Sequence, residues 1–185
     1  NPKIWTDKLK KADIKIVHVV SSSKFAVKAQ EAGCDAVVAE GFEAGGHNGR
    51  EETTTMVLIP AICKVVTIPV IAAGGIATGR QMLAAMVLGA EGVQIGSRFV
   101  ASEEASSHPL FKDMVVNAKE GDTQLSLKAL TPVRLLKNNF YNQIIEAEKK
   151  AVAIEELQKL LGRGRAKRGM FEGNLDEGEL EIGQV

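Results

Sequence analysis

The sequence lacks an excess of charge of either sign. Its 23 Lys and Arg residues are balanced by 23 Asp and Glu residues over 185 positions. A chain without a net basic field has no global attraction for nucleic acid or for an anionic membrane surface. We therefore expect neither nucleic acid nor a membrane among its partners.

Cysteines and long apolar runs are also scarce. Cys34 and Cys63 are the two cysteines, and they lack CxxC spacing and a nearby His pattern, so the sequence predicts no metal site and no disulfide framework. No apolar run approaches the length of a membrane span, and residues 1–11 lack the apolar core of a signal peptide. We expect a cytoplasmic protein with reduced, buried cysteines.

What remains is the composition of an ordinary globular chain, 45% hydrophobic and 25% charged. The charge is uneven only near the end, where a basic cluster precedes an acidic one. The basic cluster comprises Arg163, Arg165, Lys167 and Arg168, and the acidic one comprises Glu172, Asp176, Glu177, Glu179 and Glu181. We interpret both clusters as solvated surface with local pairing.

The first hundred residues repeat a pattern of strand, loop and helix. The expected strands are residues 15–20, 36–39, 70–73 and 92–95, and the expected helices are 24–32, 53–66 and 78–88. Repeats of 20 to 30 residues favour βαβ units with a parallel sheet, an α/β fold. Four strands cannot close an eight-stranded barrel. The sheet is therefore open, or its other half lies elsewhere.

Beyond residue 100 the pattern changes to helices, expected at 109–119 and 132–161, with Gly162 as a stop. We therefore expect two parts, residues 1–108 forming the βα core and residues 109–185 forming a helical appendage and tail.

Two glycine turns follow neighbouring strands. In PVIAAGGIATG and in GVQIGS an apolar strand runs into glycine where a helix begins, and backbone N–H groups in such turns bind phosphate. In a (β/α)₈ barrel the loops after strands 7 and 8 form a common phosphate site. We therefore expect Gly74, Gly75, Gly96 and Ser97 to surround a phosphorylated cofactor. The alternative is that the paired glycines only make tight turns.

The loop at residues 40–52 carries His47 between Gly46 and Asn48, and long βα loops of this kind are usually functional. We expect His47 to face the cofactor's ring. His18 is expected in the core and His108 at a helix start. Glu40 and Glu43 are expected to support the loop by accepting backbone N–H groups.

The three segments AEGFEAGGHNG, PVIAAGGIATG and GVQIGSRF, in this order, resemble the nitronate monooxygenase family, which includes the FMN-dependent type II enoyl-acyl-carrier-protein reductases. The resemblance implies a TIM (β/α)₈ barrel of which this chain is the C-terminal half, strands 5–8, with a helical appendage. Strands 1–4 would then lie upstream of Asn1, which agrees with the missing initial Met.

The resemblance also implies FMN as the cofactor and assigns roles to seven positions. His47 matches the histidine that acts on the substrate, and Gly46 matches a backbone contact to FMN. Gly75 matches the glycine of the phosphate loop, and the segment that wraps the phosphate comprises Gln94, Ile95, Gly96 and Ser97. The family often has Thr at the position of Ser97, so the hydroxyl donor is retained.

The activity implied is oxidative denitrification of alkyl nitronates or nitroalkanes to a carbonyl compound and nitrite, with oxygen and with His47 as base. The alternative within the family is an enoyl-acyl-carrier-protein reductase that requires NAD(P)H. The alternative from another class is an inert half-barrel that binds phosphate. Its open sheet edges would favour self-association, as in a homodimer.

Overall fold

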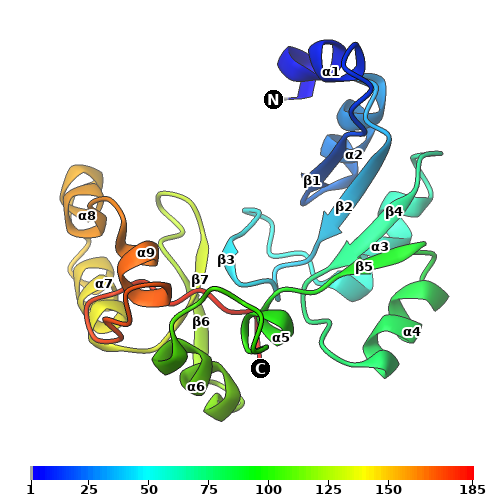
Figure 1. Cartoon of the computed structure of the whole chain (residues 1–185). Coiled ribbons are helices and arrows are strands. Elements are labelled where there is room, and N and C mark those ends of the chain that lie inside the picture. Colours follow the sequence, from blue (N-terminus) through cyan, green and yellow to red (C-terminus); the bar gives the residue numbers. More distant parts are fainter. Residues whose placement is uncertain (1) are drawn as a thin grey trace. The chain divides into compact units, whose positions relative to one another are not determined.

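The computed structural model describes residues 2–185, which divide into two compact units. Unit 1 comprises residues up to Glu43 together with Glu51–Ile95, and unit 2 comprises Ala44–Arg50 together with Gly96–Val185. Within the described residues, no helix is both long enough and apolar enough to cross a lipid bilayer. Figure 1 labels the helices and strands of both units.

Unit 1 is built on a parallel sheet, as the βα repeats predict. Its strands are β1 (Val17–Val20), β2 (Ala36–Glu40), β4 (Val70–Ala73) and β5 (Gly92–Gln94). They lie in the order β1-β2-β4-β5, and every neighbouring pair is parallel. The α/β fold class with a parallel sheet is therefore confirmed.

Two of the four helices described in unit 1 begin at a side chain that caps them. The four are α1 (Pro2–Lys10), α2 (Ser23–Glu31), α3 (Thr55–Cys63) and α4 (Gly79–Val87). The Ser22 side chain accepts from the Phe25 N–H, and Thr78 forms a reciprocal capping box with Gln81. These contacts satisfy backbone donors that the first helical turn leaves free.

The strand order decides which face of the sheet the helices cover. When successive parallel strands are added on one side, crossovers of one hand bring every helix to the same face. Ala26 of α2, Ile59 of α3 and Ala85 of α4 accordingly share one core cluster with alternate strand residues such as Val37 and Ala72.

The other face of β1 is apolar but open. Val17 and Val19 are 50% and 47% exposed, although both belong to a β-branched strand. A parallel strand is normally buried on both faces.

The carboxyl edge of the sheet contains a close crossing of two loops. Gly41 follows β2, and its N–H donates to Ala73 O at 2.9 Å. A Cβ on Gly41 would overlap Thr55 Oγ1, and one on Gly74 would lie 2.7 Å from Gly41 O. Only glycine allows the two loops to approach this closely.

Unit 2 is a three-stranded antiparallel sheet surrounded by short helices. The strands β3 (Gly46–His47), β7 (Val133–Leu136) and β6 (Thr123–Ser126) lie in that order. The helices are α5 (Ser97–Val100), α6 (Pro109–Asn117), α7 (Asn139–Lys149), α8 (Ile154–Leu161) and α9 (Arg165–Met170).

The prediction of one helix over residues 132–161 is wrong. Its first part forms β7, which is buried at all four positions and paired on both sides, followed by the separate helices α7 and α8. A run of four apolar or amphipathic residues has no periodicity that separates a buried strand from a helix. The helix at 109–119 and the stop at Gly162 are confirmed.

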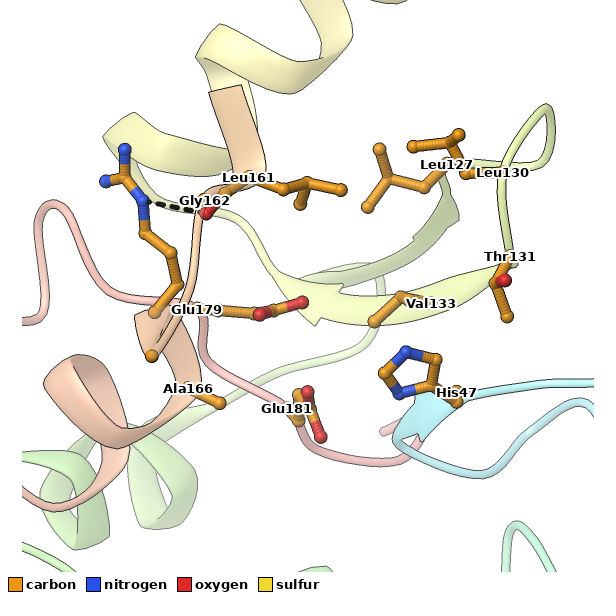
Figure 2. A pocket seen from close by; sticks show the side chains of 12 residues that line it. His47, Leu127, Leu130, Thr131, Val133, Leu161, Gly162, Ala166, Glu179 and Glu181 are labelled. Carbon is orange, nitrogen blue, oxygen red and sulfur yellow. Dashed lines mark hydrogen bonds between the residues drawn. The ribbon is translucent and has the colours of Figure 1, made fainter. Parts of the chain in front are cut away.

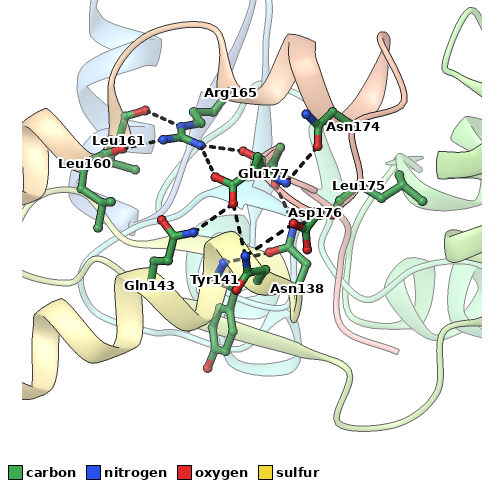
Figure 3. A network of polar contacts seen from close by, with 12 residues as sticks. Asn138, Tyr141, Gln143, Leu160, Leu161, Arg165, Asn174, Leu175, Asp176 and Glu177 are labelled. Atoms are coloured by element: carbon green, nitrogen blue, oxygen red, sulfur yellow. Dashed lines mark hydrogen bonds and ion pairs between the residues drawn. The ribbon is translucent and has the colours of Figure 1, made fainter.

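Arg165 connects three segments of unit 2, as Figure 3 shows. Its guanidinium donates to Leu160 O and Leu161 O at the end of α8, and to the Glu177 backbone O at 2.8 Å. It also pairs with the Glu177 carboxylate at 3.2 Å and lies 4.3 Å from the Phe140 ring centroid. Such a planar fork of donors fixes the tail against α7 and α8.

We predict that Gly41→Ala destabilises unit 1 by about 3 kcal/mol, because the new methyl group collides with the backbone N and hydroxyl of Thr55. The matched control is Gly79→Ala, where no atom lies within 4 Å of the added Cβ, and which should stabilise by up to about 1 kcal/mol. Urea unfolding followed by circular dichroism measures both. Equal midpoints for the two variants would contradict the close crossing.

Candidate functional site

The turn after β4 has the backbone that the glycine motif requires. Gly74 and Gly75 adopt φ of +97° and +67°, values that other residues rarely take. The register pairs Ala73 with Gln94, so the turn after β4 and the end of β5 lie at the same edge of unit 1. This agrees with the part of the expectation that concerns unit 1, in which the ends of the two strands lie side by side.

These glycines also have a structural task. A Cβ on Gly75 would lie 3.3 Å from Glu43 Cβ, and Thr55 Oγ1 lies 2.8 Å from Gly74 O. These two glycines therefore do make a tight turn. The turn does not prevent their N–H groups from also binding an anion.

Glu43 supports the loop in the way expected of it. Its carboxylate accepts from the Thr55 N–H at the first residue of α3, with N–O distances of 3.0 and 3.1 Å. A negative charge there complements the helix dipole. Glu40, at the end of β2, makes no such contact in the residues described, and burial raises its pKa.

In unit 2 the predicted residues Gly46 and His47 form strand β3. His47 pairs with Val133 of β7, and its side chain is exposed. Gly46 has a φ of +75°, and a Cβ there would lie 2.6 Å from Glu181 Oε2. The positive φ favours glycine here, and the Glu181 carboxyl lies directly beside the backbone that precedes His47.

Gly96 and Ser97 lie at the start of α5. The Ser97 hydroxyl accepts from the Gly183 N–H at 2.8 Å, which leaves its own proton available to another acceptor. No atom lies within 4 Å of a Cβ added to Gly96, so the space beside this residue is open. A small anionic group could be accommodated there.

His47 borders a pocket of about 330 Å³ within unit 2 (Figure 2). Its apolar wall is made of Leu127, Leu130, Val133 and Leu161, and its charged groups are His47, Arg165, Glu179 and Glu181. Apolar walls with a few convergent polar groups are typical of small-molecule sites. The pocket is therefore the candidate active site.

Glu179 and Glu181 were not recognised from the sequence, which suggested a solvated acidic tail. That interpretation is wrong for these two residues, because both are half-buried and line the pocket. The residues that follow each of them, Leu180 and Ile182, are buried in the core. The alternation Glu-Leu-Glu-Ile was the available signal, because successive side chains of an extended segment point to opposite sides.

The environment makes both carboxyl groups weaker acids. Burial, followed by the negative charge of Glu181, raises the pKa of Glu179 from its ordinary 4.5 to about 7, against the opposing charge of Arg165. Burial also raises the pKa of Glu181, and the charge of His47 opposes this rise. Perturbed carboxyl groups in a cleft mark candidate functional sites.

Asn48 holds the loop next to His47. Its amide nitrogen donates to Ala44 O at 2.9 Å and to Gly46 O at 3.0 Å, and its backbone N–H donates to Pro132 O. The amide oxygen is buried without a hydrogen-bond partner among the described residues. A ligand donor could satisfy it.

The predicted site residues divide between the two units. Unit 1 holds Gly74, Gly75, Gln94 and Ile95, and unit 2 holds Gly46, His47, Gly96 and Ser97. The histidines left out of the site differ from one another. His108 caps α6 as expected, whereas His18 is half-buried rather than in the core.

The cysteines of the described chain do not add a candidate site. Cys34 is buried as expected, and Cys63 is half-buried and lies 3.3 Å from Gly89 O. Within residues 2–185, no group of three or more His, Cys, Asp or Glu residues is placed to hold a metal ion.

The chain is similar to proteins of one family over its whole length. Residues 1–185 match the family described as nitronate monooxygenase. Over 152 residues the chain is 41% identical to a probable nitronate monooxygenase of Staphylococcus aureus (strain JH9), which covers 77% of this chain and 42% of that protein.

Two solved structures are also similar. FabK from Thermotoga maritima is 43% identical with a TM-score of 0.92, covering 100% of this chain and 58% of that one. A nitroalkane oxidase from Streptomyces ansochromogenes is 28% identical with a TM-score of 0.78, covering 98% of this chain and 55% of that one. The chain thus spans about half the length of the relatives it matches.

We predict that stability falls as pH rises from about 4.5 to about 7, the interval between the ordinary and the raised pKa of Glu179. In this interval the folded protein binds more protons at Glu179 than the unfolded chain does, so the free energy of unfolding decreases with pH. Glu179→Gln should flatten this slope in urea unfolding. Glu172→Gln, at an exposed carboxylate paired with Lys167, should leave it unchanged. An identical slope in Glu179→Gln would contradict the assignment.

Proposed function

Since the chain belongs to the nitronate monooxygenase family, we propose that it is part of an FMN-dependent oxidoreductase that converts alkyl nitronates or nitroalkanes and oxygen to carbonyl compounds and nitrite. The observation that carries this proposal is the exposed His47 imidazole at a pocket whose other walls are largely apolar. A nitroalkane has a short apolar chain and an acidic carbon, and it suits such a pocket.

The fold proposed for the whole protein is a TIM (β/α)₈ barrel, with the four parallel strands of unit 1 as strands 5–8. Two features of unit 1 support this proposal. The strands follow one another in sequential order with helices on one face, and the open face of β1 is apolar. A closed barrel would cover that face with further strands. Residues 109–185 would then remain an appendage to the barrel.

The residues proposed to hold FMN fit a phosphate and a heterocycle. Gly74 and Gly75 have the positive φ of an anion-binding turn, and Gly96 and Ser97 offer open space and a free hydroxyl proton. Gln94 and Ile95 of unit 1 and Gly46 of unit 2 are proposed as further contacts to FMN. When bound, FMN supplies the electron-accepting ring that the oxidation requires.

His47 is proposed as the catalytic base. A neutral nitroalkane must lose a proton from carbon before it can be oxidised, and a histidine imidazole is the side chain that most often acts as a general base. The bond formed is N–H on the imidazole, and the electron pair of the broken C–H bond stays on the substrate. A nitronate already lacks this proton, so it needs His47 less.

The second candidate is an FMN- and NAD(P)H-dependent enoyl-acyl-carrier-protein reductase. It is favoured by the similarity to FabK, which exceeds the similarity to the nitroalkane oxidase in both identity and TM-score. The apolar wall of Leu127, Leu130 and Leu161 would suit an acyl chain. In this case His47 would orient or protonate the thioester carbonyl.

The two candidates differ in their source of electrons. Mixing the purified, FMN-loaded protein with NADH or NADPH under nitrogen separates them. Fast bleaching of the flavin absorbance would support the reductase, and its absence together with nitrite release from nitroalkanes in air would support the monooxygenase. A colourless protein that takes up no FMN would support the inert phosphate-binding alternative.

We predict that His47→Gln lowers kcat for a neutral nitroalkane by roughly 10²- to 10⁴-fold, the usual contribution of a general base. With the preformed nitronate the loss should be much smaller, because no carbon acid has to be deprotonated. His18→Gln, at the half-buried histidine of unit 1, is the control and should retain activity. Equal losses on both substrates would contradict the role of base.

We predict that Ser97→Ala weakens FMN binding by roughly ten- to a hundredfold, the loss expected for a hydrogen bond to a charged group. Ser97→Thr should retain the affinity because it retains the hydroxyl. Ser107→Ala removes a comparable hydroxyl, which donates to Val100 O at 2.9 Å, and should not affect FMN. Fluorescence titration of FMN measures all three, and unchanged affinity in Ser97→Ala would remove this residue from the site.

A further inference from the structure

The pocket contains two carboxyl groups to which the proposed reaction assigns no role. Neither Glu179 nor Glu181 forms a side-chain hydrogen bond or a salt bridge within the described part of the chain, although both are half-buried. Burying a charged group without a partner is costly, so such a group tends to hold a proton. The pair therefore needs a physical explanation.

The positive charge of Arg165 acts on Glu179, but its hydrogen bonds and its ion pair are with other residues. Three of its guanidinium nitrogens donate to the Leu160, Leu161 and Glu177 backbone oxygens, and its ion pair is with Glu177. Its charge lowers the pKa of Glu179 only as the smallest of three influences. It does not neutralise the two carboxyl groups.

Among the described residues, the other segments line the pocket with no further charged side chain. Arg50, on the loop after His47, donates to Leu130 O at 2.6 Å but is not among the residues that line the pocket. The β6–β7 loop contributes Leu130 and Thr131, and α9 contributes Ala166 besides Arg165. From β7, Val133 faces the pocket. Arg134 lies on the opposite side of the strand, where its Nη1 is 3.4 Å from Thr123 Oγ1.

His47 is therefore the remaining titratable group that lines the pocket with the pair. Glu181 packs against Gly46, the residue before His47, where a Cβ would lie 2.6 Å from Glu181 Oε2. Figure 2 shows the Glu181 carboxyl between the His47 ring and Glu179 at the pocket. The Glu181 carboxyl therefore packs against the residue next to the one that carries the imidazole.

We propose that Glu179 and Glu181 are positioning residues for His47, a carboxyl pair that carries one proton while the imidazole is neutral and releases it when the imidazole is protonated. This inference rests on the proposed function of His47. Interacting groups of this kind titrate as a unit rather than one by one.

The protons and charges balance in this step. His47 gains a proton from the substrate carbon, an O–H bond of the pair breaks, and that proton passes to water in the open pocket. The combined charge of imidazole and carboxyl pair is the same before and after. The imidazolium is thereby stabilised without a permanent ion pair that would keep the base protonated before the substrate arrives.

The simpler interpretation is that both residues belong to a solvated acidic tail. Glu172 and Asp176, in the same tail, are exposed. Glu179 and Glu181 instead alternate with Leu180 and Ile182, each only 1% exposed. Their direction is fixed by this packing, so their place in the pocket is not a matter of surface mobility.

The first test does not depend on turnover. The δ-carbons of ¹³C-labelled glutamates are titrated by NMR between pH 4 and 9 in the wild type, in His47→Gln and in the control His18→Gln. We expect His47→Gln to shift the Glu181 titration to higher pH, because the charge that lowers its pKa is lost, and His18→Gln to leave it unchanged. Identical curves in all three proteins would overturn the inference.

The second test measures kcat against pH for a neutral nitroalkane. Glu181→Gln should move the acid limb of the profile to lower pH and reduce the maximal kcat roughly tenfold, with little change in KM, because the imidazolium loses its partner. Glu181→Asp should restore the profile in part, and Glu172→Gln should not alter it. An unaltered profile in Glu181→Gln, with the urea midpoint of the wild type, would overturn the inference.

The two failures can be told apart. If His47→Gln keeps full activity, the proposed function of His47 is wrong whatever the carboxyl titrations show. If His47→Gln is inactive but the titration curves of both carboxyl groups are the same as in the wild type, the proposed role of His47 as base stands. The carboxyl pair then has no role in positioning His47.

Discussion

The candidate active site of unit 2 depends on how the extended tail packs against β7. The Leu136 N–H donates to Leu180 O at 2.8 Å, and Leu180 and Ile182 enter a core cluster with Phe111 and Leu136. The alternation of an extended chain then turns Glu179 and Glu181 to the pocket. The packing of Leu180 and Ile182 in this cluster thus fixes the direction of the two acidic side chains.

The same segment contacts residues that are far away in the sequence. Ile182 lies against Gly45, Glu181 lies against Gly46, and the Gly183 N–H donates to the Ser97 hydroxyl. The loop that carries His47 and the turn that carries Ser97 are therefore both positioned by the last ten residues. A site of this kind is assembled from three parts of the chain, and none of them forms it alone.

The glycine motifs of unit 1 illustrate how one residue type serves packing and binding together. Gly41 and Gly74 let two loops cross where Thr55 begins α3, and Glu43 caps that helix. The positive φ values of Gly74 and Gly75 that the crossing requires also suit a turn that presents N–H groups to an anion. The two interpretations of these glycines are compatible, and the packing one explains why no other residue fits.

By itself the sequence determined the local structure and the family. Strand and helix positions in residues 15–95 follow from β-branched runs, Ser and Thr caps and glycine stops, because these signals act over a few residues. The motifs around His47, Gly74 and Gly96 identify the family because they occur together in order. The tertiary structure alone decided that residues 133–136 form a central strand and that Glu179 and Glu181 line the same pocket as His47. Both outcomes depend on pairing and burial against segments that are separate in the sequence, β3 and β6 for the strand and β7 for the tail. A short stretch of sequence does not encode which other segment will cover it.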